Sequence, residues 1–266
     1  MNEQLHALVE HTIAQGVGAR VFPLSWNGRR IWVKQAVPAK QKVWHRLQRF
    51  WANITGIPLL RPTVSPGGKA GLDSEAATLR NLAAKGILVP DLIDEGASWI
   101  AIGDNGGILK SFIEDEVRAG HDDKVKSYIT AAAKALARLH MAGVSHGAPL
   151  LRNMTIREDG EIGFIDFEED PNARMPVVDA QARDVLLFVF SIQREFKKRP
   201  ELLRAGWSAY VTAAGEDAAQ LLPLRKVIRL LRPVYLILRP FRRWLGTDAL
   251  NGLLAYRTLR KSLYRN

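Results

Sequence analysis

The segment from residue 123 to residue 170 constrains the fold of this chain more than any other. Apolar residues at three- and four-residue steps predict a long helix over 123–141, and Gly143 stands past its end. The loop "SHGAPLLRN" follows, and then "NMTI" and "EIGFIDF" predict two short strands around an Asp159-Gly160 turn. The candidate chemistry of this segment therefore lies in a polar loop and at a strand end.

Other patterns place strands in the front of the chain and helices in the rear. Two β-rich runs flank Asn27-Gly28, a pair that suits a type I′ hairpin turn. A helix is expected to begin with Asp73 or Ser74 as its N-cap and to stop at Gly86, and "ASWIAIGD" predicts a further strand. "DAQARDVLLFVFSIQREF" predicts a strongly apolar core helix. We expect an α+β chain with a small β-rich lobe over 1–105 and a larger helical lobe over 106–222.

Composition narrows the class of protein. An apolar content of 47% excludes wholesale disorder in a chain of 266 residues. The absence of cysteine excludes disulfides and thiolate metal sites, and the six histidines show no paired-ligand spacing. The absence of cysteine fits a protein of a reducing cytoplasm. The sequence shows neither a signal-peptide pattern nor an apolar run of 18 residues, so we expect no signal peptide and no transmembrane helix.

The net charge of +11 is concentrated in two segments. Residues 225–266 hold eleven Lys or Arg against one acid, Asp248. The interval 35–70 is predicted to be a basic insert that contains Trp44 and Trp51 and carries six cations and no acid. The remainder of the chain is net negative.

The C-terminal tail, 223–266, combines its cations with apolar residues at helical spacing, from Leu224 to Leu245, and with Trp244. Pro233 and Pro240 predict short, kinked helical pieces. A basic amphipathic face of this kind suits an anionic membrane surface, which makes such a surface the favoured partner. A solvated helical end and packing against the lobes are the plainer alternatives, and nucleic acid is disfavoured because no reader module accompanies the charge.

Four residues along the chain match the needs of phosphoryl transfer. That reaction requires a cation on the phosphates, oxygen ligands for Mg²⁺ and a group that positions the attacking hydroxyl. Lys34 lies on a predicted strand and Glu75 on the next predicted helix. Asn153 follows the long helix, and Asp166 ends a later strand.

This order resembles the protein-kinase-like superfamily over about residues 15–200. "HGAPLLRN" is similar to the catalytic loop H-x-D-x-x-x-x-N, and "IDFEED" is similar to the D-F-G region. The combination of "LARLHMAGVSHG", "N" and "IDFE" is most similar to small bacterial kinases of lipopolysaccharide Kdo or heptose and to aminoglycoside phosphotransferases. The resemblance implies a bilobal fold, ATP with Mg²⁺ or Mn²⁺, and a hydroxyl acceptor.

The resemblance also implies a role for each site residue. Lys34 would contact the phosphates and Glu75 would hold Lys34, while Asn153 and Asp166 would bind the metal. The "GVG" of Gly16 and Gly18 would cover the phosphates. His146 and Asp184 would have structural roles, since they correspond to the loop histidine and to a helix aspartate that braces the catalytic loop.

Two positions depart from the family pattern. Ala148 stands where the family carries the aspartate that accepts or orients the hydroxyl proton, and Glu168 replaces the glycine of D-F-G. One interpretation is an atypical phosphotransferase at the cytoplasmic face of a membrane, in which Glu168, Glu169 or a water fills part of the gap. It would act on a lipid, a lipopolysaccharide sugar or a protein hydroxyl, and the sequence does not identify this acceptor. The alternatives are a pseudokinase scaffold, an engineered Asp-to-Ala change, and transfer of AMP in place of phosphate.

Overall fold

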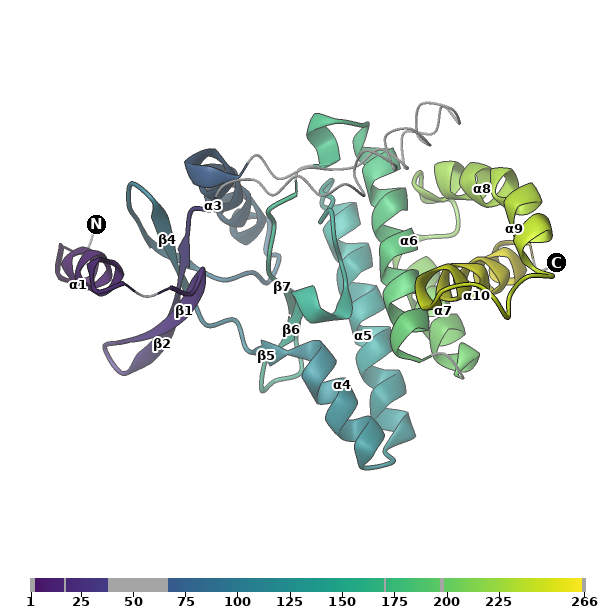
Figure 1. Cartoon of the computed structure of the whole chain (residues 1–266), viewed down its shortest axis with the longest axis horizontal. Helices are drawn as coiled ribbons and strands as arrows, with labels where there is room; N and C mark the ends of the chain where they lie inside the picture. The colour runs from purple at the N-terminus through teal and green to yellow at the C-terminus, as the bar shows by residue number, and fades with distance from the viewer. Residues whose placement is uncertain (1–2, 17, 38–66, 170, 197–198, 265–266) are drawn as a thin grey trace.

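The computed structural model describes residues 3–16, 18–37, 67–169, 171–196 and 199–264. It is a mixed α+β structure. A four-stranded sheet lies at one end of the long axis, and helices fill the middle and the opposite end (Figure 1). The predicted basic insert lies largely outside the described residues, including Trp44, Phe50 and Trp51.

The front sheet is fully antiparallel, in the order β1-β2-β4-β3. Asn27 and Gly28 both have positive φ, 49° and 72°, so the predicted type I′ turn between the first two strands is confirmed. The strands are β1 (Val21–Trp26), β2 (Arg29–Gln35), β3 (Leu92–Glu95) and β4 (Trp99–Gly103).

Alternation along β2 decides which side chains face the site. Successive side chains of a strand point to opposite faces. Ile31 and Val33 therefore pack under helix α1 (Glu3–Ala14), together with Trp99. Lys34 faces the other side of the sheet, where Ile100 packs against helix α3 (Gly68–Ala84).

Helix α3 begins five residues before the predicted N-cap, and that detail of the prediction was wrong. Its N-cap is Gly67, and Gly67 and Gly68 both have positive φ. Asp73 lies inside the helix and forms an exposed ion pair with Lys69 four residues earlier, so it caps nothing. The predicted stop is confirmed, because the helix ends before Gly86, whose φ is 70°.

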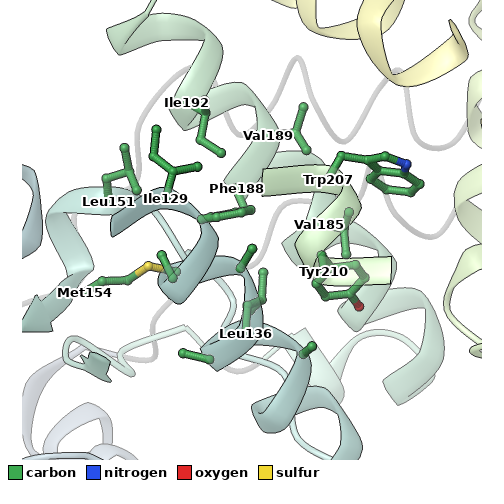
Figure 2. Close-up of a cluster of buried hydrophobic side chains, with 14 of the residues drawn as sticks. Ile129, Leu136, Leu151, Met154, Val185, Phe188, Val189, Ile192, Trp207 and Tyr210 are labelled. Atoms are coloured by element: carbon green, nitrogen blue, oxygen red, sulfur yellow. The ribbon is translucent and has the colours of Figure 1, made fainter. Parts of the chain in front are cut away.

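The helical part is built on the long central helix. The predicted helix at 123–141 is confirmed as α5 (Asp122–Met141), and the apolar helix after the candidate loop is confirmed as α6. Figure 2 shows Ile129 and Leu136 of α5 packed with Phe188 and Ile192 of α6. The other elements are α4 (Leu109–Arg118), α6 (Val177–Glu195), α7 (Pro200–Ala214), and the 3₁₀ turns η2 (Leu151–Asn153) and η3 (Pro171–Ala173).

A second, three-stranded sheet carries the candidate loop to the edge of the helical core. Its antiparallel order is β5-β6-β7, and the last two strands are the predicted pair around residues 158–160. Met154, Ile156 and Phe164 join the helical core from this sheet. The strands are β5 (Gly107–Ile108), β6 (Met154–Ile156) and β7 (Ile162–Phe164).

The C-terminal tail contributes to the same core. Leu224, Val227 and Ile228, the first residues of the predicted bilayer face, are buried in it, together with Tyr256 and Leu259. The tail contains two short helices, of 10 and 7 residues, and one longer helix of 17 residues, and α9 has a proline in its first turn. They are α8 (Leu221–Leu230), α9 (Arg232–Leu238) and α10 (Thr247–Leu263). Over the described ranges, no helix is long and apolar enough to cross a bilayer.

Candidate active site

A cavity of about 990 Å³ brings four of the predicted site residues together. Its walls come from the front sheet, helix α3, the connection between β4 and β5, and the ends of β6 and β7. Lys34, Glu75, Asn153 and Asp166 all line it. These residues span more than a hundred positions of the sequence, so the fold gathers them.

The Lys34 ammonium is the charged centre of the cavity. The Lys34 side chain is 7% exposed, and its Nζ lies 2.7 Å from Glu75 Oε2 and 3.2 Å from Asp166 Oδ1. A third carboxylate, that of Glu168, lies 2.5 Å from the same nitrogen. Lys34 therefore joins the sheet, helix α3 and the loop after β7.

Arg20, which the sequence analysis missed, completes this cluster. It lines the cavity just before β1 and is hydrogen-bonded to Glu168. No local pattern marks this pair, because 148 positions separate its members. Glu168 thus sits between two cations at the place where the family pattern has glycine.

The pKa values of the cluster follow from burial and charge. Burial lowers the pKa of Lys34, but the charges of Glu75, Asp166 and Glu168 outweigh it and raise that pKa above its ordinary value. Burial raises the pKa of Glu75. Burial also acts to raise the pKa of Glu168, but the Arg20 hydrogen bond and the Lys34 charge lower it to about 2. Lys34 and Glu168 are therefore both charged at neutral pH.

Asp166 and Asn153 are linked by the backbone. The amide of Ile165 donates to the carbonyl of Asn153 at 3.0 Å, which fixes the strand end beside the 3₁₀ turn. Asp166 has φ of 70°, in the left-handed region that non-glycine residues rarely adopt. Such conformations cost of order 1–3 kcal/mol and concentrate at functional sites. Its carboxylate is nearly half exposed to the cavity.

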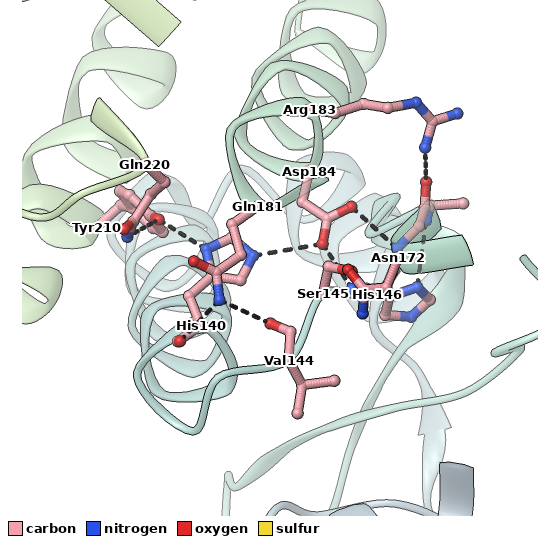
Figure 3. A network of polar contacts seen from close by, with 12 residues as sticks. His140, Val144, Ser145, His146, Asn172, Gln181, Arg183, Asp184, Tyr210 and Gln220 are labelled. Atoms are coloured by element: carbon pink, nitrogen blue, oxygen red, sulfur yellow. Dashed lines mark hydrogen bonds and ion pairs between the residues drawn. The ribbon is translucent and has the colours of Figure 1, made fainter. Parts of the chain in front are cut away.

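Asp184 holds the candidate loop through the backbone amides of the loop (Figure 3). Its fully buried carboxylate accepts hydrogen bonds from the amides of His146, at 2.5 Å, and Gly147, at 2.9 Å. It also lies 3.3 Å from Nε2 of His140. This placement is that of the brace that the sequence resemblance implies for Asp184.

The network continues toward the C-terminal helices (Figure 3). Gln220, at the start of α8, donates to the Tyr210 hydroxyl at 2.8 Å. That hydroxyl lies 2.7 Å from His140 Nδ1, while the opposite ring nitrogen faces the carboxylate of Asp184, which can only accept a hydrogen bond. Nε2 of His140 therefore carries the proton that faces Asp184. The start of α8 is thus connected to the loop by hydrogen bonds.

His146 is positioned as a packing residue. Its ring is fully buried and stacks on Phe167 with a centroid distance of 4.5 Å. Burial lowers the pKa of His146, so the ring is neutral at physiological pH. Its Nδ1 lies 3.3 Å from the amide nitrogen of Ala148. The ring shapes the loop and does not line the cavity.

Ala148 has no polar side-chain atom, so only its backbone can form hydrogen bonds. Its carbonyl accepts a hydrogen bond from Asn153 Nδ2 at 3.0 Å, which holds the amide of Asn153 in place. Gly147 has φ of +91°, and a Cβ there would lie 2.9 Å from Cβ of Glu169. Arg183 contacts both the Gly147 carbonyl and Glu169. Glu169 therefore lies beside the loop, paired with a cation.

The structure does not bring Gly16 and Gly18 to the cavity wall. Both lie in the connection between α1 and β1, and the lining from this part of the chain begins at Arg20. Residue 17 lies outside the described residues.

The residues present fit a nucleotide with a divalent cation. Asn105, in the connection after β4, lines the cavity, and its buried Oδ1 has no hydrogen-bond partner within the described part of the chain. An amino group such as that of adenine would supply a donor of the kind that this oxygen lacks. Over the same residues no group of three or more His, Asp or Glu side chains is arranged to hold a metal by itself. Mg²⁺ commonly binds through one or two carboxylates together with phosphates and water, so one carboxylate and one amide suffice here.

Comparison with known proteins adds no assignment. The chain matches no protein-family model and no curated protein sequence. The geometry of the cavity and the sequence motifs are therefore the observations that bear on its function.

Proposed function

We propose that the chain is an atypical ATP-dependent phosphotransferase with a bilobal, protein-kinase-like arrangement. The observation that carries the proposal is the convergence of Lys34, Glu75, Asn153 and Asp166 on one cavity. The separate apolar clusters of the front sheet and the helical part support a division into two lobes. The cavity lies between these parts.

Each residue has a chemical role in this proposal. Lys34 is the cation that contacts the nucleotide phosphates, and the buried Glu75 carboxylate holds its ammonium in place. Asp166 and Asn153 hold Mg²⁺ or Mn²⁺, which supplies neutralising charge for the phosphates. Asp184 keeps the loop amides aligned, as a positioning residue. Asn105 accepts the amino group of the adenine ring.

Glu168 gives the ligand-free cavity its own counter-ion. Its carboxylate contacts Lys34 and Arg20, the two cations that nucleotide phosphates would approach. Phosphates and carboxylate compete for these cations, so Glu168 must move aside for nucleotide to bind. This competition makes the affinity for nucleotide sensitive to residue 168.

The missing base at Ala148 makes turnover slow but does not prevent it. Phosphoryl transfer has a loose transition state that is stabilised mainly by charge and positioning. Glu169 is paired with Arg183, so it is not free to act as a strong base in this arrangement. Glu168, once nucleotide has displaced it from the cations, and a water at the loop are the remaining acceptors for the hydroxyl proton.

A pseudokinase that binds nucleotide without turning it over is the second candidate function. The observations that favour it are the side chain at position 148 and the pairing of Lys34 with three carboxylates. Product analysis separates the possibilities: ADP indicates phosphoryl transfer, pyrophosphate indicates AMP transfer, and neither product indicates a binding module.

The experiment measures product release from Mg²⁺-ATP by the wild-type chain, Asp166→Asn and Ala148→Asp. We expect slow ADP formation that Asp166→Asn abolishes and that Ala148→Asp raises by about 10²-fold, the lower end of general-base effects. ADP formation that is unchanged in Asp166→Asn contradicts the proposal.

We place this activity at the inner face of a membrane, as a peripheral protein. The support is an exposed set of apolar side chains in the tail, which includes Ile237, Phe241 and Trp244, beside many arginines. Deleting the tail is a poor test, because Val227 and Tyr256 belong to the core. Surface substitutions are needed instead.

A further inference from the structure

A second cavity, of about 1110 Å³, is formed by C-terminal helices that lie at the end of the molecule opposite the front sheet (Figure 1). Its lining comes from α7, α9 and α10 and from the turn between α9 and α10. It shares no residue with the candidate active site. We call it the C-terminal cavity.

The lining of the C-terminal cavity is strongly basic. Its charged residues are all cations and include no acid: Arg204, Arg239, Arg242, Arg257, Arg260 and Lys261. Among the residues that the structure describes, none of these six has an ion-pair partner. Like charges around one cavity repel, so a bound anion relieves their repulsion.

The rest of the lining is apolar or aromatic. Leu250, Leu253 and Leu254 of α10 contribute aliphatic surface, and Tyr235 and Tyr256 approach with ring centroids 4.8 Å apart. The hydroxyl of Tyr256 is buried and lacks a hydrogen-bond partner within the described residues. The cavity therefore combines cations with apolar and aromatic walls, which together suit an anion that carries hydrocarbon.

Exposed apolar side chains stand next to this cavity. Ile237 lies on α9, and Phe241 and Trp244 lie in the turn that follows, with Trp244 80% exposed. The ring centroids of Phe241 and Trp244 lie 5.9 Å apart. An aromatic and aliphatic rim beside basic residues is typical of helices that lie in the interface of an anionic bilayer.

We propose that the C-terminal cavity binds the phosphate headgroup of an anionic phospholipid in a bilayer. Ile237, Phe241 and Trp244 enter the interface while the cations contact the headgroup. An anionic headgroup is the favoured occupant because its charge complements that of the cavity, and no described acid in the lining competes for these cations. The inference rests on the membrane-surface part of the proposed function and not on its catalytic part.

The test measures sedimentation with vesicles of mixed phosphatidylglycerol and phosphatidylcholine, without nucleotide. The full chain is compared with Arg242→Gln/Arg257→Gln and with the control Lys126→Gln/Lys134→Gln. Both pairs are exposed and unpaired among the described residues, and both changes remove two charges. Each surface cation contributes about 1 kcal/mol, so the first variant should bind about 30-fold more weakly. The control should bind nearly as the wild type does.

A second comparison tests the apolar rim. Trp244→Ser should weaken vesicle binding by about tenfold, because a large side chain no longer leaves water. Met141→Ser, which changes an exposed apolar residue at the end of α5, should not. These side chains are exposed, so unchanged thermal melts are expected and verify that the variants are folded.

Four results overturn the proposal. Two concern vesicles: the two double substitutions weaken binding equally, or the chain binds vesicles of phosphatidylcholine alone equally tightly. In the other two, the chain does not bind vesicles but binds RNA, or does not bind vesicles but binds glycerol phosphate in calorimetry. The last result assigns the cavity to a free anion. Because nucleotide is absent, vesicle binding is decided separately from catalysis.

Discussion

The two charged cavities of this molecule differ in how their charge is balanced. In the candidate active site, Lys34 contacts three carboxylates, and Arg20 contacts one of them. In the C-terminal cavity, six cations face one space without any described ion-pair partner. The first site holds its own counter-ions, so a ligand must displace one of them. For the second we propose an anion from outside the chain.

The largest effect is expected from removing the centre of the balanced site. Lys34→Met leaves the buried carboxylate of Glu75 without its cation, which should lower the free energy of unfolding by about 3 kcal/mol or more. The matched control is Lys69→Met, in the exposed pair with Asp73, which should cost no more than about 0.5 kcal/mol. Urea denaturation of both variants measures the difference. Equal losses are incompatible with an internally balanced site.

The next effect concerns the loop brace. Asp184→Asn places an amide nitrogen opposite buried donors from His146, Gly147 and His140. We expect a loss of about 2 kcal/mol of stability, because one buried donor then lacks an acceptor. Thermal unfolding measures it, with the exposed Asp159→Asn as a control. If Asp184→Asn loses no more stability than the control does, Asp184 does not brace the loop.

Glu168 tests the competition for cations. Glu168→Gln removes the internal counter-ion of Lys34 and Arg20, so affinity for Mg²⁺-ATP should rise by about tenfold or more. One charge interaction at about 4 Å contributes between about 1 kcal/mol in water and about 4 kcal/mol near a protein surface. Isothermal titration calorimetry measures the change. Weaker binding in the variant identifies Glu168 as a metal ligand instead.

Acid also probes Glu168. Its pKa is about 2 in the folded chain against an ordinary 4.5, so its ionised form stabilises the fold above pH 4.5. That contribution declines as the pH falls from 4.5 toward 2. Melting temperatures recorded over this range should fall less steeply in Glu168→Gln than in the wild type. Parallel curves contradict the assigned pKa.

The smallest effect on stability is expected in the unbalanced site. Arg239→Gln removes an exposed cation that has no ion-pair partner among the described residues, so stability should change by less than about 0.5 kcal/mol. Urea denaturation in low and high salt measures it. A loss comparable to that of Lys34→Met shows that the C-terminal cavity has a structural counter-ion.

Local patterns predicted most of the regular elements. The Asn27-Gly28 turn, the apolar spacing of α5 and the run that became α6 each depend on neighbouring residues. The start of α3 was not predictable from capping residues, since Gly67 begins it through backbone conformation. The first half of the predicted bilayer face packs into the core, because an apolar stripe does not reveal what covers it.

The candidate site was predicted less completely. Motif order suggested Lys34, Glu75, Asn153 and Asp166, and they share one cavity. Arg20 was missed because its contact with Glu168 depends on tertiary structure alone. Gly16 and Gly18 lie away from the cavity lining, since a two-glycine match carries little information about loop position.

The central claim is that the cavity around Lys34 binds nucleotide with a metal ion. The most direct test is calorimetric titration of ATP into the chain with Mg²⁺ or Mn²⁺ present or absent, repeated with Asp166→Asn. The account predicts binding that requires the metal and is lost in Asp166→Asn, while the melting temperature stays within a few degrees of the wild type. Absence of binding in the folded wild type, or equal affinity in Asp166→Asn, contradicts it.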